Sequence, residues 1–283
     1  MANLLEGMDR LGFGYLKNAD LFEEEHKQEK EETTANADNK EPEIVMETDF
    51  ILDKSFVCPV CGAKFTSKIV KAGKAKLIGS DDDLRPKYAG IDTVKYDAIM
   101  CEECGYAALS KYFTNLTPPQ IKLIRENVCS QYKKISYTND IYTYDEAIER
   151  LQMSLVNAMA KRAKASEKAY ICLKMAWVYR GKAENLPKNA SKYEQYLADT
   201  KAAEMSAIKN AYEGFLVSIE KEIPPICGMD DSTITYLLAN LAIKCNDMDN
   251  AKRFISRILL SRTANERIKN RARDLKELIR QTP

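Results

Sequence analysis

Two cysteine pairs constrain the fold of this chain more than any other feature. Cys58 and Cys61 form one Cys-x-x-Cys hook, Cys101 and Cys104 form a second, and a glycine follows each hook. The two-residue gap lets both sulfurs of a hook point at one ion, and four thiolates suit tetrahedral zinc. Because four thiolates fill the coordination sphere, no position is left for water or substrate. The hooks therefore predict a structural zinc ion bound by Cys58, Cys61, Cys101 and Cys104.

The remaining cysteines and the apolar pattern bear on the cellular compartment. The other cysteines stand singly, as Cys129, Cys172, Cys227 and Cys245, and are most simply small core residues. A redox role for a hook is the weaker reading, because neither hook opens a clear helix after a strand. Apolar runs long enough to span a membrane are lacking, and Glu6 and Asp9 stand where a signal peptide would be basic. We expect a cytoplasmic protein with reduced thiols.

Charge is distributed unevenly along the chain. Residues 19–49 hold twelve Asp or Glu against three Lys, whereas the whole chain has a net charge of +1. This segment has few large apolar groups, so we expect an acidic disordered linker. It also contains His26, the only histidine of the chain. Chemistry that needs a histidine base or a histidine-ligated metal therefore has no candidate in the folded body.

Residues 1–18 predict an apolar docking peptide. Leu4, Leu5, Met8 and Leu11 fall on one helical stripe. A helix this short cannot bury the stripe by itself. The spacing is typical of a helix that binds in a groove. The groove could lie on another protein or on the body of this chain.

A β-containing head is predicted for residues 50–117. Short β-type runs separated by glycines occur at Phe65–Val70, Lys76–Ile78 and Tyr96–Met100. The 39 residues 62–100 separate the hooks, which exceeds the usual spacing of a compact zinc ribbon. We therefore expect an insertion between the hooks, centred on Ser80–Tyr88.

Residues 118–283 predict a helical domain. We expect helices at 118–135, 144–164, 167–183, 191–221, 232–246, 249–260 and 264–281. Three pairs match the capping-box spacing: Thr143 with Glu146, Ser191 with Glu194, and Thr263 with Glu266. Small residues in 238–258 fall near tetratricopeptide consensus positions, although the helix at 191–221 is too long for a standard repeat. The predicted fold class is mainly α: an irregular tetratricopeptide-like array with a small β-containing, zinc-ribbon-like head.

The aspartates of the insertion have two interpretations. Asp81–Asp83, with Asp92 and Asp97, could bind Mg²⁺ or Ca²⁺ through oxygen ligands, as a metal-dependent enzyme would require. Alternatively, the carboxylates cap a turn or pair with Arg85 or Lys87, and so fix the insertion against the zinc core. We favour the second interpretation.

Basic residues gather in two places. The predicted C-terminal helices carry Arg253, Arg257, Arg262, Arg267, Lys269, Arg271, Arg273, Lys276 and Arg280. Near the first hook stand Lys64, Lys68, Lys71, Lys74 and Lys76. Either set could contact nucleic-acid phosphates. A solvated helix face is the common explanation of the first set, and a contact with the acidic linker is a third possibility. The lysines would offset the charge of a zinc tetrathiolate.

The hooks and the insertion resemble a known family. The resemblance rests on Cys58–Gly62, Asp82–Tyr88, Tyr96-Asp97 and Cys101–Ala108, and it extends over roughly Lys54–Cys245. These segments resemble the uncharacterised bacterial domain of unknown function numbered twenty-two twenty-five. The resemblance implies a zinc-ribbon-like head joined to a tetratricopeptide-like body, and it implies no established activity. Glu102-Glu103 stands where a proline is common in such hooks, so the second hook is expected to be less rigid.

The leading functional hypothesis is a cytoplasmic adaptor that is not an enzyme. A closed zinc site, predicted helical repeats and the lack of a phosphate-binding or nucleophile motif favour it. The helical body would bind a protein or peptide. The alternative is a nucleic-acid-binding protein that uses the basic residues, and a weaker one is an enzyme that uses a metal at Asp81–Asp83. The oligomeric state cannot be inferred from the sequence.

Overall fold

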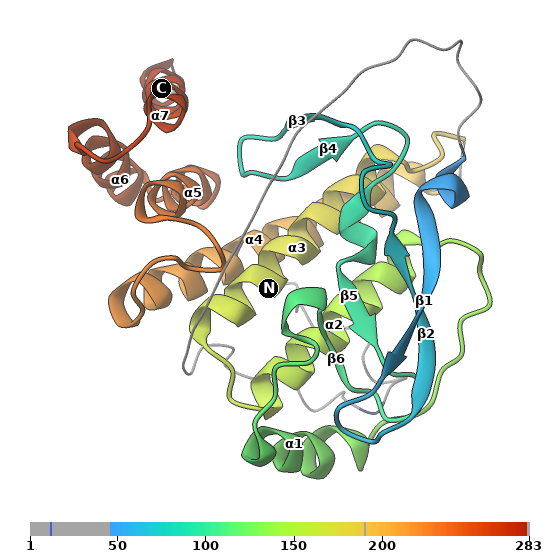
Figure 1. The fold of residues 1–283 in the computed structure, drawn as a ribbon. Coiled ribbons are helices and arrows are strands. Elements are labelled where there is room, and N and C mark those ends of the chain that lie inside the picture. The colour runs from blue at the N-terminus through green and yellow to red at the C-terminus, as the bar shows by residue number, and fades with distance from the viewer. Residues whose placement is uncertain (1–11, 13–45, 190, 282–283) are drawn as a thin grey trace.

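The computed structural model describes residues 12, 46–189 and 191–281 of the chain (Figure 1). The predicted docking peptide, apart from Gly12, and the predicted linker up to residue 45 lie outside the described residues. The end of that linker belongs to the 3₁₀ turn Glu47–Phe50. There the Glu47 carboxylate lies 2.6 Å from Lys95 Nζ and accepts a hydrogen bond from the Tyr96 hydroxyl. The folded part of the chain therefore begins before Phe50.

The described strands form three two-stranded antiparallel hairpins. The strands are β1 (Ile51–Val57), β2 (Lys64–Val70), β3 (Leu77–Ser80), β4 (Pro86–Tyr88), β5 (Ala98–Met100) and β6 (Ala107–Leu109). β1 pairs with β2, β3 with β4, and β5 with β6. The predicted runs correspond to β2, β3 and β5, and β3–β4 is the predicted insertion.

The three hairpins differ in burial because their residues differ. β5 and β6 consist of apolar residues that are buried on both faces, as a short continuous apolar run predicts. They pack against the helix α2 (Tyr144–Ala160). Every residue of β3 is exposed. The insertion hairpin therefore needs contacts other than an apolar core to hold its position.

The helices follow the predicted order, and the mainly α fold class with a small β head is confirmed. They are α1 (Pro118–Ile124), α2, α3 (Ala165–Glu184), α4 (Tyr193–Lys221), α5 (Asp231–Lys244), α6 (Met248–Leu260) and α7 (Glu266–Gln281). The prediction of a helix to residue 135 is wrong. α1 passes into the π-helical turn Arg125–Cys129, after which the chain turns and Tyr132 packs against Gly105.

One of the three predicted capping boxes is present. The Glu146 backbone N–H donates to the Thr143 hydroxyl, and the Thr143 N–H donates to the Glu146 carboxylate. The other two are wrong. α4 begins after Lys192, which has a positive φ of 64°. At α7 the Asn265 side chain accepts from the Ile268 N–H, so the cap lies two residues later than predicted.

The helices form one connected body with the head (Figure 1). α3 is buried around most of its circumference and packs between α2 and α4, as its apolar sequence predicts. α5 packs against α4, α6 and α7, and these last helices stand apart from the β1–β2 hairpin. One apolar core runs from Cys58 to Leu275 without a break between head and helices. The tetratricopeptide likeness of this body stays a prediction.

Candidate metal centre

The first hook is the turn of the β1–β2 hairpin. β1 ends at Val57, so Cys58 follows directly, and β2 begins three residues after Cys61. The Gly62 N–H donates to Cys58 O (N···O 2.9 Å), and the Cys58 N–H donates to Ala63 O (2.9 Å). Gly62 has a φ of 78°, which disfavours any residue with a side chain. This backbone turns both sulfurs toward the same side.

The second hook is built in the same way between β5 and β6. The Gly105 N–H donates to Cys101 O (2.8 Å), and the Cys101 N–H donates to Tyr106 O (2.8 Å). Gly105 has a φ of 74°, and a Cβ at this position would lie 2.5 Å from the Tyr132 ring. The glycine is thus required both by its conformation and by the packing of Tyr132.

The four sulfurs converge on one point. Cys58 Sγ lies 3.6 Å from Cys104 Sγ, and Cys61 Sγ lies 3.7 Å from Cys101 Sγ. All four sulfur atoms lie within 4.8 Å of one another. A tetrahedron with zinc–sulfur bonds of about 2.3 Å has edges of about 3.8 Å. The donor set and its spacing therefore fit a zinc ion held by the four predicted residues.

The thiols share hydrogen bonds, which move their pKa values apart. The neighbouring thiols of Cys104 and Cys58 lower the pKa of Cys101. The pKa of Cys104 is raised, first by its hydrogen bond to Cys101, then by those with Cys129 and Cys58 and by burial. The hydrogen bond to Cys101 also raises the pKa of Cys58 to about 12. A bound divalent cation is what would let all four sulfurs ionise together.

Polar groups of the helical region hold both hooks. Arg125 Nε donates to Val60 O (2.9 Å), Asn157 Nδ2 donates to Gly105 O (2.9 Å), Arg150 Nη2 donates to the Glu102 carboxylate (3.0 Å), and Lys134 Nζ donates to the Glu103 carboxylate (2.6 Å). The last two contacts involve the glutamates that stand in place of a proline. The second hook is thus held by ion pairs with residues outside it. The local sequence of the hook does not reveal these ion pairs.

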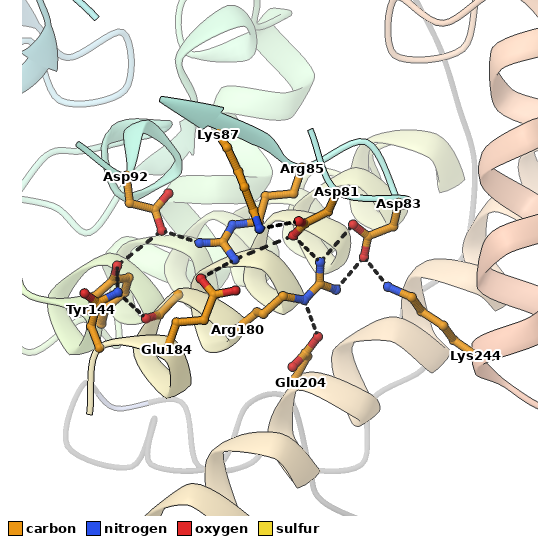
Figure 2. A network of polar contacts seen from close by, with 12 residues as sticks. Asp81, Asp83, Arg85, Lys87, Asp92, Tyr144, Arg180, Glu184, Glu204 and Lys244 are labelled. Carbon is orange, nitrogen blue, oxygen red and sulfur yellow. Dashed lines mark hydrogen bonds and ion pairs between the residues drawn. The ribbon is translucent and has the colours of Figure 1, made fainter. Parts of the chain in front are cut away.

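Asp83 is the centre of a second polar cluster, distinct from the sulfurs (Figure 2). Its carboxylate is fully buried and accepts hydrogen bonds from Arg180 of α3 and Lys244 of α5, with Lys244 Nζ at 2.6 Å. Burial by itself would raise the pKa of Asp83, but the bonds and charges of Arg180 and Lys244 outweigh burial and lower the pKa to about 2. Asp83 is therefore a buried carboxylate whose countercharges come from two helices.

The neighbouring carboxylate is paired within the insertion as well as to α3. Asp81 lies 2.7 Å from Lys87 Nζ, 2.9 Å from Arg180 Nη1 and 3.7 Å from Arg85 Nη1. The predicted pairing with Lys87 and Arg85 is confirmed. Arg180 and Lys244 were not predicted, and they tie the insertion to the helical body instead of to the zinc core alone.

Arg85 connects the insertion to the C-terminal end of α3 (Figure 2). Its buried guanidinium lies 3.0 Å from the Asp92 carboxylate and 2.9 Å from the Glu184 carboxylate. A Cβ on Gly181 would lie 2.4 Å from Asp92 Oδ2 and 2.7 Å from the Tyr144 ring. Glycine at this position of α3 therefore lets the cluster sit directly on the helix.

These contacts engage four of the five aspartates that the sequence offers as a cation site. Asp81 and Asp83 are bound by basic side chains, Asp92 by Arg85, and Asp97 by Lys174 at 2.6 Å. Within the described part of the chain, the four cysteines are the only group of Cys, His, Asp or Glu whose ligand atoms come close enough to hold a metal ion. The interpretation of the aspartates as a metal site is therefore not supported.

Several of the basic residues noted in the sequence contact acidic or carbonyl groups of this chain. On the C-terminal helices these are Arg257 with Asp231 (2.6 Å), Lys269 and Arg273 with Glu266 (3.8 and 3.4 Å), and Arg271 with Asp81 O (2.7 Å). Near the first hook, Lys68 lies 3.2 Å from Asp53. The two basic sets are thus partly engaged in intramolecular contacts.

The single cysteines differ in their surroundings. Cys172 is fully buried in α3, as expected of a core residue. Cys129 is different, because its interaction with Cys104 of the sulfur cluster lowers the pKa of its thiol. It lies in the π-helical turn after α1, a position that its sequence spacing from the hooks does not indicate.

The comparisons extend the family resemblance. Residues 51–279 match the model of DUF2225, described as an uncharacterised protein conserved in bacteria. No curated protein and no solved structure matches the chain. Among the described helices, none combines the length and apolar character needed to cross a bilayer.

Proposed function

Starting from the fact that the chain belongs to the DUF2225 family of uncharacterised bacterial proteins, we propose that it is a zinc-stabilised adaptor without catalytic activity. In this proposal the zinc ion closes the head, and the helical body binds a protein or peptide. The observation that carries the proposal is the convergence of Cys58, Cys61, Cys101 and Cys104 into a closed set of four sulfurs.

A tetrathiolate supports a structural role for the metal. When bound, zinc would cross-link the β1–β2 and β5–β6 hairpins, which share no strand pairing. Three of the ligands, Cys58, Cys101 and Cys104, are buried. A catalytic zinc usually has three protein ligands and an open position, which this set does not offer.

The remaining chemistry of the described residues supports a binding role more than a catalytic one. The only histidine, His26, lies outside them, and the buried carboxylate of Asp83 is neutralised by Arg180 and Lys244. The thiolate ligands require a reducing environment, which supports a cytoplasmic location.

Although the strands of the head expose large apolar side chains as well, we place partner binding on those of the helical body. They are Tyr196 and Met205 on α4, Ile223 after α4, Leu260 at the end of α6 and Leu278 on α7. Leu260 is 83% exposed and Ile223 is 73% exposed. Large apolar groups that remain in water at such levels favour association with a partner.

Two measurements on the full chain test the proposal. Elemental analysis is expected to find one zinc per chain. Affinity capture with wild-type protein is expected to retain a protein partner, and Leu260→Asp to retain at least tenfold less of it at unchanged zinc content. Ser256→Asp is the matched control, because Ser256 is also exposed on α6. Equal capture by all three proteins would contradict binding through the helical body.

The same affinity capture distinguishes protein binding from the alternative, nucleic-acid binding. Nuclease treatment before elution is expected to leave the captured protein in place. Release by nuclease, together with a steep loss of binding as salt is raised, would instead favour phosphate contacts by the basic residues. The intramolecular contacts of Arg257, Lys269, Arg271 and Arg273 make this the less favoured candidate.

A further inference from the structure

We propose that the N-terminal segment, residues 1–11, docks in cis on the outer face of α1. The first observation is a groove of about 430 Å³ on that face, lined by Pro118, Ile121, Lys122, Arg125 and Glu126. Its surface is formed by the apolar groups of Pro118 and Ile121, with charged side chains beside them. An amphipathic helix with an apolar stripe is the kind of ligand that such a groove takes.

The second observation places Gly12 near the end of the helical segment that carries this groove. Gly12 is described by the structure, and a Cβ built on it would lie 2.1 Å from the Gln131 carbonyl oxygen and 3.8 Å from the Lys133 side chain. Gly12 has a φ of 95°. Its backbone therefore lies against residues that follow α1 and its π-helical turn by only a few positions, although 119 residues separate Gly12 from Gln131 in the sequence.

The lengths of the two segments match. From Gln131 back to Ile121 there are ten residues of mostly helical chain, which span about 15 Å at 1.5 Å per residue. Residues 1–11 in helical form span about 16 Å. A helix that leaves Gly12 and runs back along α1 thus brings its apolar stripe, Leu4, Leu5, Met8 and Leu11, along the groove.

The charges of the segment and of the groove are mixed, because Arg10 accompanies Glu6 and Asp9, and Glu126 lies 3.8 Å from Lys122. Glu6 and Asp9 lie between the apolar positions of the segment. Lys122 is exposed on the rim of the groove, with a side-chain exposure of 77%. Opposite charges at the rim fix the orientation of a docked helix more than they add affinity. The groove also borders Arg125, which donates to Val60 O of the first hook, so the docked segment would lie beside the metal centre.

A photo-crosslinking amino acid at position 5 of the full chain tests the proposal. The expected product is an intrachain crosslink to peptides within residues 118–126, identified by mass spectrometry. Ile121→Asp is expected to reduce its yield at least fivefold, while Pro119→Asp is the control on the same helix, because Pro119 is exposed and does not line the groove. Zinc content and helicity of each variant show that the body remains folded.

Other products would overturn the proposal. A crosslinked dimer, a crosslink to a different protein, or an intrachain crosslink outside residues 118–126 would each place the segment elsewhere. An independent measurement uses hydrogen exchange in residues 118–126. The double variant Leu5→Asp and Leu11→Asp is expected to speed it at least fivefold, and unchanged exchange would contradict docking. The inference does not depend on the adaptor proposal, since neither readout involves a partner protein.

Discussion

The four cysteines and the aspartates of the insertion are two clusters of acidic groups within the first half of the chain. Asp83 receives its countercharge from inside the molecule, from Arg180 and Lys244. The sulfurs of Cys58 and Cys104 lie 3.6 Å apart and those of Cys61 and Cys101 lie 3.7 Å apart, and each of these sulfurs has another thiol as its close partner. The contrast teaches that a cluster of acidic groups indicates a metal only where the fold does not itself supply the cations.

The largest loss of stability is expected at the four cysteines, whose countercharge would come from a bound metal ion. Cys101→Ser is expected to abolish zinc binding and unfold the head, because structural zinc contributes about 10 kcal/mol or more of apparent binding free energy, which is also folding free energy. Elemental analysis and circular dichroism measure the two consequences. Cys245→Ser, which lies outside the sulfur cluster, is the control and is expected to keep one zinc per chain. Retention of zinc by Cys101→Ser would contradict the view that the four cysteines depend on a metal ion for their countercharge.

The second prediction concerns the internally compensated cluster. Asp83→Asn removes a fully buried charge and leaves Arg180 and Lys244 without it, so we expect a loss of about 3–5 kcal/mol in the free energy of unfolding. Urea denaturation of the zinc-loaded protein at pH 7 measures it. The adjacent Asp82→Asn is the control, since Asp82 is exposed and is expected to change stability by less than about 0.5 kcal/mol. Equal effects of both variants would show that burial of Asp83 is unimportant.

Acid provides a finer test of the same carboxylate. Because the pKa of Asp83 is lowered from 3.8 to about 2, its stabilising contribution is present above pH 4 and is lost as the pH falls toward 2. The stability difference between wild type and Asp83→Asn should therefore shrink by about 1 kcal/mol between pH 5 and pH 3. Taking the difference cancels the effect of acid on zinc binding, which both proteins share. A difference that stays constant over this range would place the pKa of Asp83 elsewhere.

The smallest effect is expected at the exposed edge of the cluster. Lys87 pairs with Asp81 at 2.7 Å, but its side chain is 45% exposed and Asp81 also contacts Arg180. Lys87→Ala should therefore cost only about 0.2–1 kcal/mol, less at high salt. Thermal melts at low and high salt would measure it. A cost near that of Asp83→Asn would mean that the insertion is held mainly by its own residues.

Local spacing allowed the cluster of four cysteines to be predicted, while the aspartate cluster required contacts that no local pattern reveals. The hooks are each complete within five residues, so Cys58 and Cys61 could be read directly from the sequence. Arg180 and Asp83 are 97 residues apart, and Lys244 and Asp83 are 161 apart. Only the partners within the insertion, Arg85 and Lys87, could be predicted from the sequence.

The helices show the same division between local and distant causes. Apolar periodicity and the Thr143–Glu146 box predicted where α2 begins, because both signals lie within one helix. The end of α1 was missed, and beyond the π-helical turn that follows it Tyr132 packs against Gly105 next to the second hook, a contact that no local pattern reveals. The similarity of the last helices to tetratricopeptide repeats rests on small residues in 238–258 and remains a prediction.

The long sequence separation of the Asp83 contacts has a consequence for the timing of folding. The hooks close over 40 and 46 residues, so the head can complete its metal ligands soon after Cys104 is synthesised. Lys244 emerges 161 residues after Asp83, which corresponds to about 8–32 s at roughly 5–20 residues per second. We therefore expect the Asp83 carboxylate of the newly made head to stay hydrated until α3 brings Arg180, and the insertion to take its final place only when α5 brings Lys244.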